Sequence, residues 1–128
     1  MTAERTLNVG MLGCGTVGSH VARLLAQDSG DFAARSGATL VLKSVAVRDG
    51  KKKRNDLGSA NVTTDPQTIV ADPTIDIVIE VMGGIEPARG LLLSAIKNGK
   101  SVVTANKALL AKHGAELFEA ADKNGVDL

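Results

Sequence analysis

Three glycines near the N-terminus, Gly13, Gly15 and Gly18, have the spacing G-x-G-x-x-G. They follow the apolar run Leu7 to Leu12 and precede a helical pattern that opens at Thr16. In such a unit the first glycine permits a tight turn, the second lets the backbone approach a pyrophosphate, and the third lets the helix pack close to the sheet. The helix N-terminus then favours a bound anion. The pattern predicts a dinucleotide cradle. A purely structural turn is the alternative interpretation, because 14 of the 128 residues are glycine.

Basic residues follow the second predicted strand, Thr39 to Val47. The strand runs into Arg48, and the basic run Lys51 to Arg54 follows shortly after. At this position of a dinucleotide fold an acidic residue holds the ribose 2′-hydroxyl, whereas an arginine suits a 2′-phosphate through its planar fork. The order here favours NADP as the preferred cofactor and leaves NAD as the second candidate. A solvated surface loop is the alternative interpretation of the lysines.

Two further segments are expected beside the cofactor, because ligands of parallel sheets lie across the carboxyl ends of the strands. One runs from Met82 through Gly83 to Gly84, at the end of the apolar run Ile75 to Met82, and the other runs from Thr104 to Lys107. Lys107 is the cation placed beside the nicotinamide ring, where it would orient a carbonyl, polarise it or relay a proton. An exposed lysine in the first turn of a helix is the structural alternative.

Other polar residues give weaker signals. Glu80 lies inside a predicted strand, where a carboxylate is more often hydrogen-bonded at the strand end than catalytic. His20 and His113 fall on predicted helix surfaces, so the sequence predicts no metal site and no nucleophile-base pair. Cys14 is expected to fill a small site beside the phosphates.

Strands that alternate with helices are needed to bring these residues together. The pattern predicts an α/β fold with a doubly wound parallel sheet of Rossmann type and the strand order 3-2-1-4-5. Residues 126–128 have the composition of the start of one more strand. The predicted strands are Leu7 to Leu12, Thr39 to Val47, Val62 to Thr64, Ile75 to Met82 and Ser101 to Ala105; helices are expected from Thr16, from Asp65 to Ala71, from Pro87 to Asn98, from Asn106 to Asn124 and, as a short piece, from Asp31 to Arg35.

Helical spacing also predicts which side chains face the sheet. The last helix is expected to be capped by Asn106 and to break near His113. The expected buried residues are Val17, Val21, Leu24 and Leu25 in the first helix, Leu92, Ala95 and Ile96 with Leu91 or Leu93 flanking in the helix after Pro87, and Leu110, Gly114, Leu117, Phe118 and Ala121 in the last helix.

The composition argues against several classes of function. A length of 128 residues fits one domain, with 44% hydrophobic and 23% charged residues. A net charge of +1 and only two aromatic residues give no reason to expect a nucleic acid or an anionic membrane as partner. No apolar run approaches the ~20 residues that cross a bilayer, and the N-terminus lacks a signal-peptide core. With a single cysteine as well, a cytoplasmic location is expected.

Three blocks of the sequence resemble a known family. They are VGMLGCGTVG, SVAVRDGKKKR and DIVIEVMGGIEPARGLLLSAIKNGKSVVTANKALLAKHGAEL, and in this order they are similar to the N-terminal half of homoserine dehydrogenase. The glycine loop is common to many oxidoreductases, whereas EVMGG followed by VVTANKALLA is much more specific.

The resemblance implies a reaction and a set of site residues. Homoserine dehydrogenases interconvert L-homoserine and L-aspartate 4-semialdehyde with NADPH or NADH, on the route to threonine, methionine and isoleucine. Thr16 and Val17 match positions whose backbone lies on the pyrophosphate. Arg48 and Lys52 match the basic pair that binds the 2′-phosphate. Lys107 matches one of two lysines that the family uses in catalysis.

The resemblance also implies that part of the enzyme lies outside this sequence. The second lysine, the metal-binding loop and the dimerisation strands of the family belong to a substrate-binding domain. Residues 1–128 are therefore expected to be the NAD(P)-binding domain of a longer, homo-oligomeric enzyme, inactive as a separate piece. Two other interpretations stay open: another dehydrogenase of the aspartate pathway, and a non-catalytic module that senses NAD(P).

Overall fold

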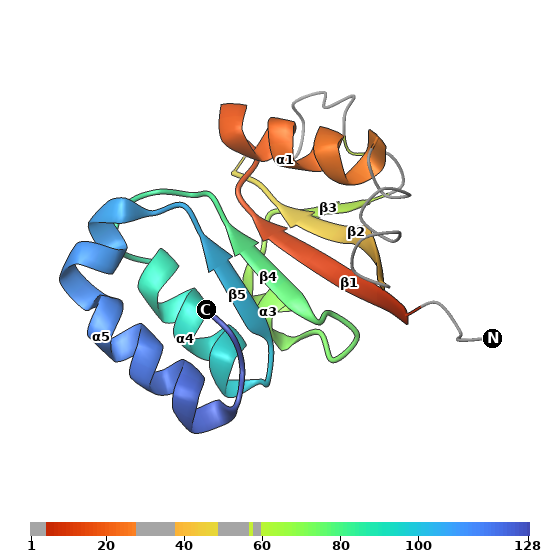
Figure 1. Ribbon diagram of the computed structural model, residues 1–128. Helices are drawn as coiled ribbons and strands as arrows, with labels where there is room; N and C mark the ends of the chain where they lie inside the picture. Colours follow the sequence, from red (N-terminus) through yellow and green to blue (C-terminus); the bar gives the residue numbers. More distant parts are fainter. Residues whose placement is uncertain (1–4, 28–37, 49–56, 58–59) are drawn as a thin grey trace.

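In the part of the chain that the structure describes, five parallel strands form one sheet in the order β3-β2-β1-β4-β5 (Figure 1). The computed structural model describes residues 5–27, 38–48, 57 and 60–128. Every pairing between neighbouring strands is parallel. The α/β class, the doubly wound parallel sheet and the strand order predicted from the sequence are confirmed. The strands are β1 (Arg5–Leu12), β2 (Ala38–Ala46), β3 (Asn61–Thr63), β4 (Ile77–Glu80) and β5 (Ser101–Thr104).

Helices cover both faces of this sheet (Figure 1). Helix α1 (Thr16–Gln27) packs on one face, while α3 (Gln67–Ala71), α4 (Ala88–Lys97) and α5 (Lys107–Asn124) lie on the other side. Successive side chains of β1 point to opposite faces of the sheet, so they pack alternately against the two helix layers. Met11 is fully buried in a cluster with Ala22 of α1, and Leu12 is fully buried in a cluster with Ile96 of α4. Because they are covered on both faces, the central strands read as continuous apolar runs.

The strands on either side of α4 are shorter than predicted. β4 spans Ile77–Glu80 instead of 75–82, and β5 ends at Thr104 instead of Ala105. The chain leaves the ladder gradually, because the amide of Val81 still donates to the carbonyl of Leu12 at 3.0 Å. The prediction extended both strands because apolar residues continue past the last paired position.

The face of α1 that meets the sheet differs from the prediction. Val17 and Leu24 are 55% and 51% exposed, whereas Gly18 and Ala22 are buried. A Cβ at position 18 would lie 3.1 Å from a carbonyl oxygen of the glycine loop. The small residues therefore let α1 approach the sheet, and their row becomes the contact face in place of the larger side chains. Of the four predicted residues, Leu25 is buried, and Val21 is half-buried against the cluster of Met11 and Ala22.

The buried face of α5 is also partly different from the prediction. Leu117 and Ala121 are buried as expected, but Phe118 is 55% exposed and Leu109 is fully buried. Phe118 follows Leu117 by one position, which turns its side chain about 100° around the helix. The predicted break is present, because the backbone of His113 is not helical (φ −129°, ψ 15°). Because the helix is interrupted at His113, counting one continuous face along it predicts Leu110 as the buried residue instead of Leu109. The predicted core residues of α4 are confirmed, and of the two flanking candidates Leu91 is buried and Leu93 is half-buried.

Some predicted elements are absent or undescribed. Residues 126–128 form no strand, although the carbonyl of Asp127 accepts a hydrogen bond from the amide of Val102 at 2.9 Å and so lies beside β5. The short helix expected from Asp31 to Arg35, and the basic run Lys51 to Arg54, lie outside the described residues.

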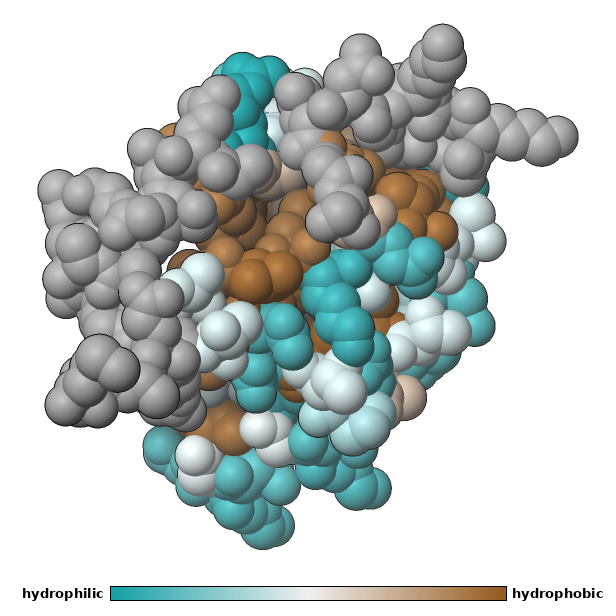
Figure 2. Space-filling view, turned by 90° about the vertical axis from the view of Figure 1, so that its right-hand side faces the viewer, coloured by the Kyte–Doolittle hydropathy of each residue, from teal (hydrophilic) through white to brown (hydrophobic). Residues whose placement is uncertain are grey.

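Hydrophobic side chains remain partly exposed at the β2–β3 end of the sheet. Seen from the right of Figure 1, the molecule shows hydrophobic residues gathered near the centre of the face, with hydrophilic ones beside them (Figure 2). Val41 of β2 and Val62 of β3 are each 40% exposed. Hydrophobic residues that are partly exposed in this way are common at the surface of folded proteins.

Candidate cofactor site

The last paired residues of the five strands lie in one row across the sheet. Leu12 of β1 pairs with Ala46 of β2 and with Glu80 of β4. Ala46 pairs in turn with Thr63 of β3, and Glu80 pairs with Thr104 of β5. Because all the strands are parallel, the loops that follow them emerge at the same edge. This edge is where ligands bind in doubly wound sheets.

The glycine loop lies between the end of β2 and the residues that follow β4. Gly13 has φ +95°, and its amide donates to the carbonyl of Ala46 at 2.8 Å. A Cβ on Gly13 would lie 3.2 Å from the backbone of Met82, and one on Gly18 would lie 3.3 Å from Cγ2 of Val81. The turn at Gly13 and the close packing at Gly18 thus agree with the prediction. The contact of either residue with a pyrophosphate stays a prediction.

The start of α1 is open toward the solvent. Gly15, Thr16 and Val17 are exposed, and a Cβ on Gly15 would meet no atom within 4 Å. The first amides of an α-helix have no partner within the helix, so they are available to an anion. The space at Gly15 and the amides behind it fit a pyrophosphate group.

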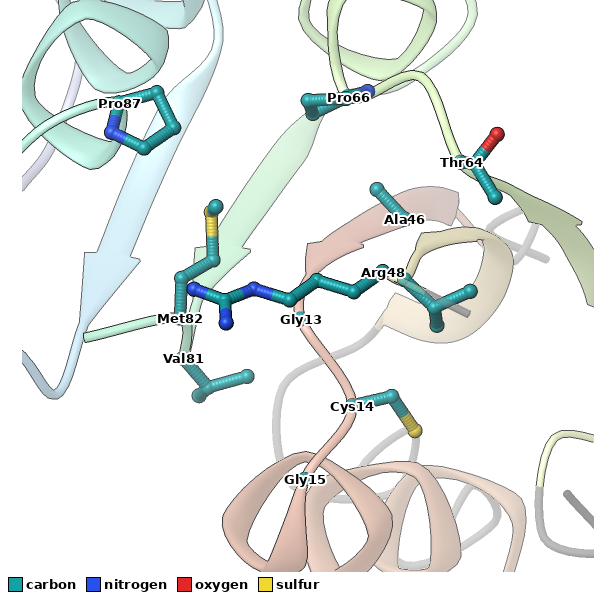
Figure 3. Close-up of a pocket in the computed structure, with 11 residues that line it drawn as sticks. Gly13, Cys14, Gly15, Ala46, Arg48, Thr64, Pro66, Val81, Met82 and Pro87 are labelled. Carbon is teal, nitrogen blue, oxygen red and sulfur yellow. The ribbon is translucent and has the colours of Figure 1, made fainter. Parts of the chain in front are cut away.

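A cavity of about 410 Å³ lies beside this loop (Figure 3). Its volume falls in the range of small-molecule sites, roughly 300 to 1,000 Å³. Gly13, Gly15 and Arg48 are the predicted site residues that line it. Cys14 also lines it and is half-buried, and its place beside the cofactor phosphates stays a prediction. The lining residues are Gly13, Cys14, Gly15, Ala46, Val47, Arg48, Thr64, Pro66, Val81, Met82 and Pro87.

Arg48 follows the end of β2 after one intervening residue and is exposed. In Figure 3 its side chain is extended across the cavity and its guanidinium points toward Met82, on the β4 side. The planar fork is therefore accessible to an anion, although it points across the cradle rather than outward along β2. Lys52, its predicted partner, lies outside the described residues.

Sequence reasoning missed several lining residues. Thr64 and Pro66 follow β3, and Pro87 precedes α4. The signal was present for Thr64, because a residue directly after any parallel strand emerges at the same edge as the glycine loop. Pro66 and Pro87 begin helices in the sequence, and nothing in their local pattern points to a cavity.

The remaining predicted site residues lie at the ends of β4 and β5, outside the lining of this cavity. Gly83 and Lys107 are exposed, Thr104 is half-buried, and Lys107 is the first residue of α5. Gly83 and Thr104 are brought together by Glu80, whose side chain is fully buried between them. Oε2 of Glu80 accepts from the amide of Gly83 at 3.1 Å, and Oε1 accepts from the hydroxyl of Thr104 at 2.6 Å. Glu80 thus has the hydrogen-bonded role expected of it at the strand end.

Asn106 connects the same two loops on the side of α5. Its Oδ1 accepts from the amide of Leu109 at 3.1 Å, which confirms the predicted cap. Its Nδ2 donates to the carbonyl of Gly84 at 2.5 Å. The backbone directly before Lys107 is therefore fixed to the loop that follows β4.

Two described side chains with a shifted pKa, Lys100 and Asp72, lie away from the edge where the glycine loop is. Burial lowers the pKa of Lys100, whose Nζ donates to the carbonyl of Ile75 at 2.9 Å. Hydrogen bonds from Thr74 lower the pKa of Asp72. Both residues belong to the loops before β4 and β5, at the opposite end of the strands.

The described residues show neither a metal cluster nor a membrane helix. Within residues 5–27, 38–48, 57 and 60–128, no group of three His, Cys, Asp or Glu side chains is placed to hold a metal ion. In the same part of the chain, no helix combines the length and apolarity needed to span a membrane.

Comparison with known proteins places the chain in a family. The family model described as "Homoserine dehydrogenase, NAD binding domain" matches residues 13–128. The homoserine dehydrogenase of Mycobacterium tuberculosis is 46% identical over 125 residues, which cover 98% of this chain and 28% of that protein.

Solved structures agree with this match. A crystal structure of S. aureus homoserine dehydrogenase has a TM-score of 0.92 and 41% identity, and the match covers 98% of this chain and 32% of that one. The homoserine dehydrogenase of Thiobacillus denitrificans has a TM-score of 0.90 and 45% identity, with 95% and 28% covered. The chain spans 28% to 32% of the length of these relatives. It belongs to the homoserine dehydrogenase family, within which it corresponds to the NAD-binding domain.

Proposed function

We propose that the protein to which these residues belong interconverts L-homoserine and L-aspartate 4-semialdehyde, with NADP as the preferred cofactor and NAD as the second. The names of the relatives support this reaction. Since the chain spans only 28% of the M. tuberculosis relative, the activity is assigned to a longer protein. The 128 residues would bind the cofactor and supply one catalytic group.

The carboxyl edge of the sheet fits a nicotinamide dinucleotide. The open space at Gly15, the first amides of α1 and the cavity of about 410 Å³ support this fit. When bound, the dinucleotide supplies a hydride acceptor or donor at its nicotinamide ring. We assign the pyrophosphate to Gly13, Gly15, Thr16, Val17 and Gly18, the 2′-phosphate to Arg48 and Lys52, and the nicotinamide end to Gly83, Thr104 and Lys107.

Lys107 would act on the substrate carbonyl. Its ammonium would donate a hydrogen bond to the aldehyde oxygen of aspartate 4-semialdehyde and stabilise the negative charge that develops there. The same group would deliver the proton that completes the alcohol, and would accept it back in the direction of homoserine oxidation.

The order of charges along the edge is the observation that carries the proposal. Arg48 follows β2, the glycine loop follows β1, and Lys107 follows β5 at the head of α5. In the sheet order β2-β1-β4-β5 the backbone positions of Arg48 and Lys107 therefore lie on opposite sides of the glycine loop. This separation suits a dinucleotide whose phosphate-bearing ribose and reactive ring are at opposite ends.

The wider setting follows from the family. We propose that the reaction serves threonine, methionine and isoleucine biosynthesis, in the cytoplasm, and that the complete protein is a homo-oligomer. The isolated 128-residue chain would bind the dinucleotide and turn over no substrate. Family membership favours this assignment over another dehydrogenase of the same pathway and over a non-catalytic sensor.

Initial rates of homoserine oxidation by the full-length protein test the proposal. We expect dinucleotide reduction with both cofactors and a higher kcat/KM for NADP than for NAD. A sensor would bind both dinucleotides and oxidise nothing. Absence of homoserine oxidation with either cofactor contradicts the proposed reaction, and a preference for NAD contradicts the assignment of Arg48.

A further inference from the structure

We propose that Glu80 is a positioning residue, which fixes the loop after β4 to the loop after β5 and thereby sets the place of Lys107. This proposal rests on the proposed function only for the role of Lys107. The link between the two loops is a property of the described residues themselves.

The side chain of Glu80 is the centre of the link. It is fully buried at the last paired position of β4, opposite Thr104 of β5. Oε2 accepts from the amides of Met82 at 2.8 Å and Gly83 at 3.1 Å. Oε1 accepts from the hydroxyl of Thr104 at 2.6 Å. One carboxylate thus holds two amides of the first loop and the strand-end hydroxyl of the second.

A relay continues from Thr104 to α5. The amide of Asn106 donates to Oγ1 of Thr104 at 3.0 Å, and Asn106 caps the helix that begins at Lys107. Asn106 also donates back to the carbonyl of Gly84 at 2.5 Å. Hydrogen bonds therefore run from Glu80 to the residue before Lys107 by two routes, one through each loop.

Because Glu80 is buried, its hydrogen bonds hold the two loops firmly in place. A buried carboxylate is costly without partners, so the arrangement that satisfies all three donors is strongly preferred over any other. A shift of either loop would break at least one bond to a carboxylate that solvent does not reach. Because catalytic geometry is sensitive to displacements of about 1 Å, a loosened link would lower turnover without removing any group that touches the cofactor phosphates.

Substitution of Thr104 tests the link most cleanly. Thr104→Val keeps the shape and removes the hydroxyl, whereas Thr104→Ser keeps the hydroxyl. Thr63→Val is the matched control, because Oγ1 of Thr63 accepts from the amide of Asp65 at 3.1 Å at the end of β3, away from the loops after β4 and β5. Each full-length variant is compared with wild type in kcat, in the Kd for NADPH and in melting temperature.

The expected result is a separation of turnover from binding. The hydroxyl of Thr104 is engaged by Glu80 and by the amide of Asn106, so its loss should weaken NADPH binding far less than it slows turnover. Thr104→Val lowers kcat roughly tenfold to a hundredfold, whereas the Kd for NADPH rises by a much smaller factor, about threefold at most. Thr104→Ser restores kcat to within about threefold, and Thr63→Val leaves kcat unchanged at saturating cofactor. Wild-type kcat in Thr104→Val, or equal loss in Thr104→Val and Thr63→Val, overturns the positioning role.

Amide hydrogen exchange tests the link without any activity. In Thr104→Val the exchange of the Met82 and Gly83 amides should rise roughly tenfold, although their own acceptor is untouched, since one anchor of Glu80 is lost. Unchanged exchange at both amides overturns the link. If the full-length wild type shows no dehydrogenase activity, the proposed function fails, while this exchange experiment still decides whether Glu80 couples the loops.

Glu80→Gln provides a second variant if Thr104→Val unfolds. Its amide replaces one carboxylate oxygen by a donor, and the same rise in the exchange of the Met82 and Gly83 amides is expected.

Discussion

Lys107 is the residue on which the proposed chemistry depends. It is exposed at the head of α5 and is assigned to the substrate carbonyl rather than to the cofactor phosphates. Lys107→Ala in the full-length protein should therefore lower kcat at least roughly a hundredfold and leave the Kd for NADPH nearly unchanged. Steady-state rates and cofactor titration measure the two effects. Lys112→Ala, an exposed position on the same helix, is the control and should keep wild-type kcat.

Arg48 should determine the choice between the two dinucleotides. Arg48→Ala is expected to weaken NADPH binding by ~1.5 to 3 kcal/mol, the scale of a hydrogen bond to a charged group, and to leave NADH nearly unchanged. Arg48→Lys keeps the charge without the planar fork and should fall between wild type and Arg48→Ala. Fluorescence titration with both cofactors measures the difference. Equal losses for NADPH and NADH would show that Arg48 does not read the 2′-phosphate.

Asp72 supplies a prediction about pH. The hydroxyl and the amide of Thr74 donate to its Oδ1 at 2.6 and 2.8 Å, and with a smaller contribution from Lys43 they lower the pKa of this carboxyl. A pKa that is lower in the folded state adds stability above the unfolded value, about 4, which is lost as the pH falls through the folded value. Asp72→Asn should therefore melt a few degrees below wild type at neutral pH, and the difference should shrink below about pH 4. A difference in melting temperature that stays constant from neutral to acidic pH argues against this origin.

At the scale of elements, we expect the glycine loop to contain one glycine needed for stability, Gly13, and one needed for dinucleotide binding, Gly15. Gly13 has φ +95°, and a Cβ added there would lie 3.2 Å from backbone atoms. Gly13→Ala should therefore destabilise the protein by about 1 to 3 kcal/mol. Gly15 has open space around it, so Gly15→Ala should keep the melting temperature and weaken dinucleotide binding instead. Gly114→Ala in α5 is the control, because a Cβ there also meets no atom within 4 Å. It should lower neither the melting temperature nor the affinity for the dinucleotide. Thermal melts and cofactor titration of the three variants check this order.

The elements also show what could be predicted from the sequence. Strand order and the turn at Gly13 follow from local patterns, namely apolar runs, glycine spacing and the alternation of strands with helices. The buried face of α1 does not, because it depends on how closely Gly18 approaches the sheet. The contacts of Glu80 were predictable only in kind, since its partner Thr104 lies 24 residues away and is placed by strand pairing. Thr64 escaped prediction because the local pattern marks β3 only as a short strand at the edge of the sheet.

At the scale of the whole molecule, the chain holds one part of the proposed catalyst. The match to the S. aureus homoserine dehydrogenase covers 98% of this chain but only 32% of that protein. Arg48, the glycine loop and Lys107 all lie at one edge of one sheet. The groups that hold homoserine would then come from the remainder of the protein, so binding of the dinucleotide and turnover should be separable.

The most direct measurement compares the full-length protein with the isolated 128-residue chain in NADPH binding and in the rate of aspartate 4-semialdehyde reduction. We expect both proteins to bind NADPH and only the full-length protein to oxidise it in the presence of the aldehyde. Two results would contradict the proposed division of roles: a full-length protein that leaves NADPH unoxidised with this substrate, or a correctly folded isolated chain that fails to bind the dinucleotide.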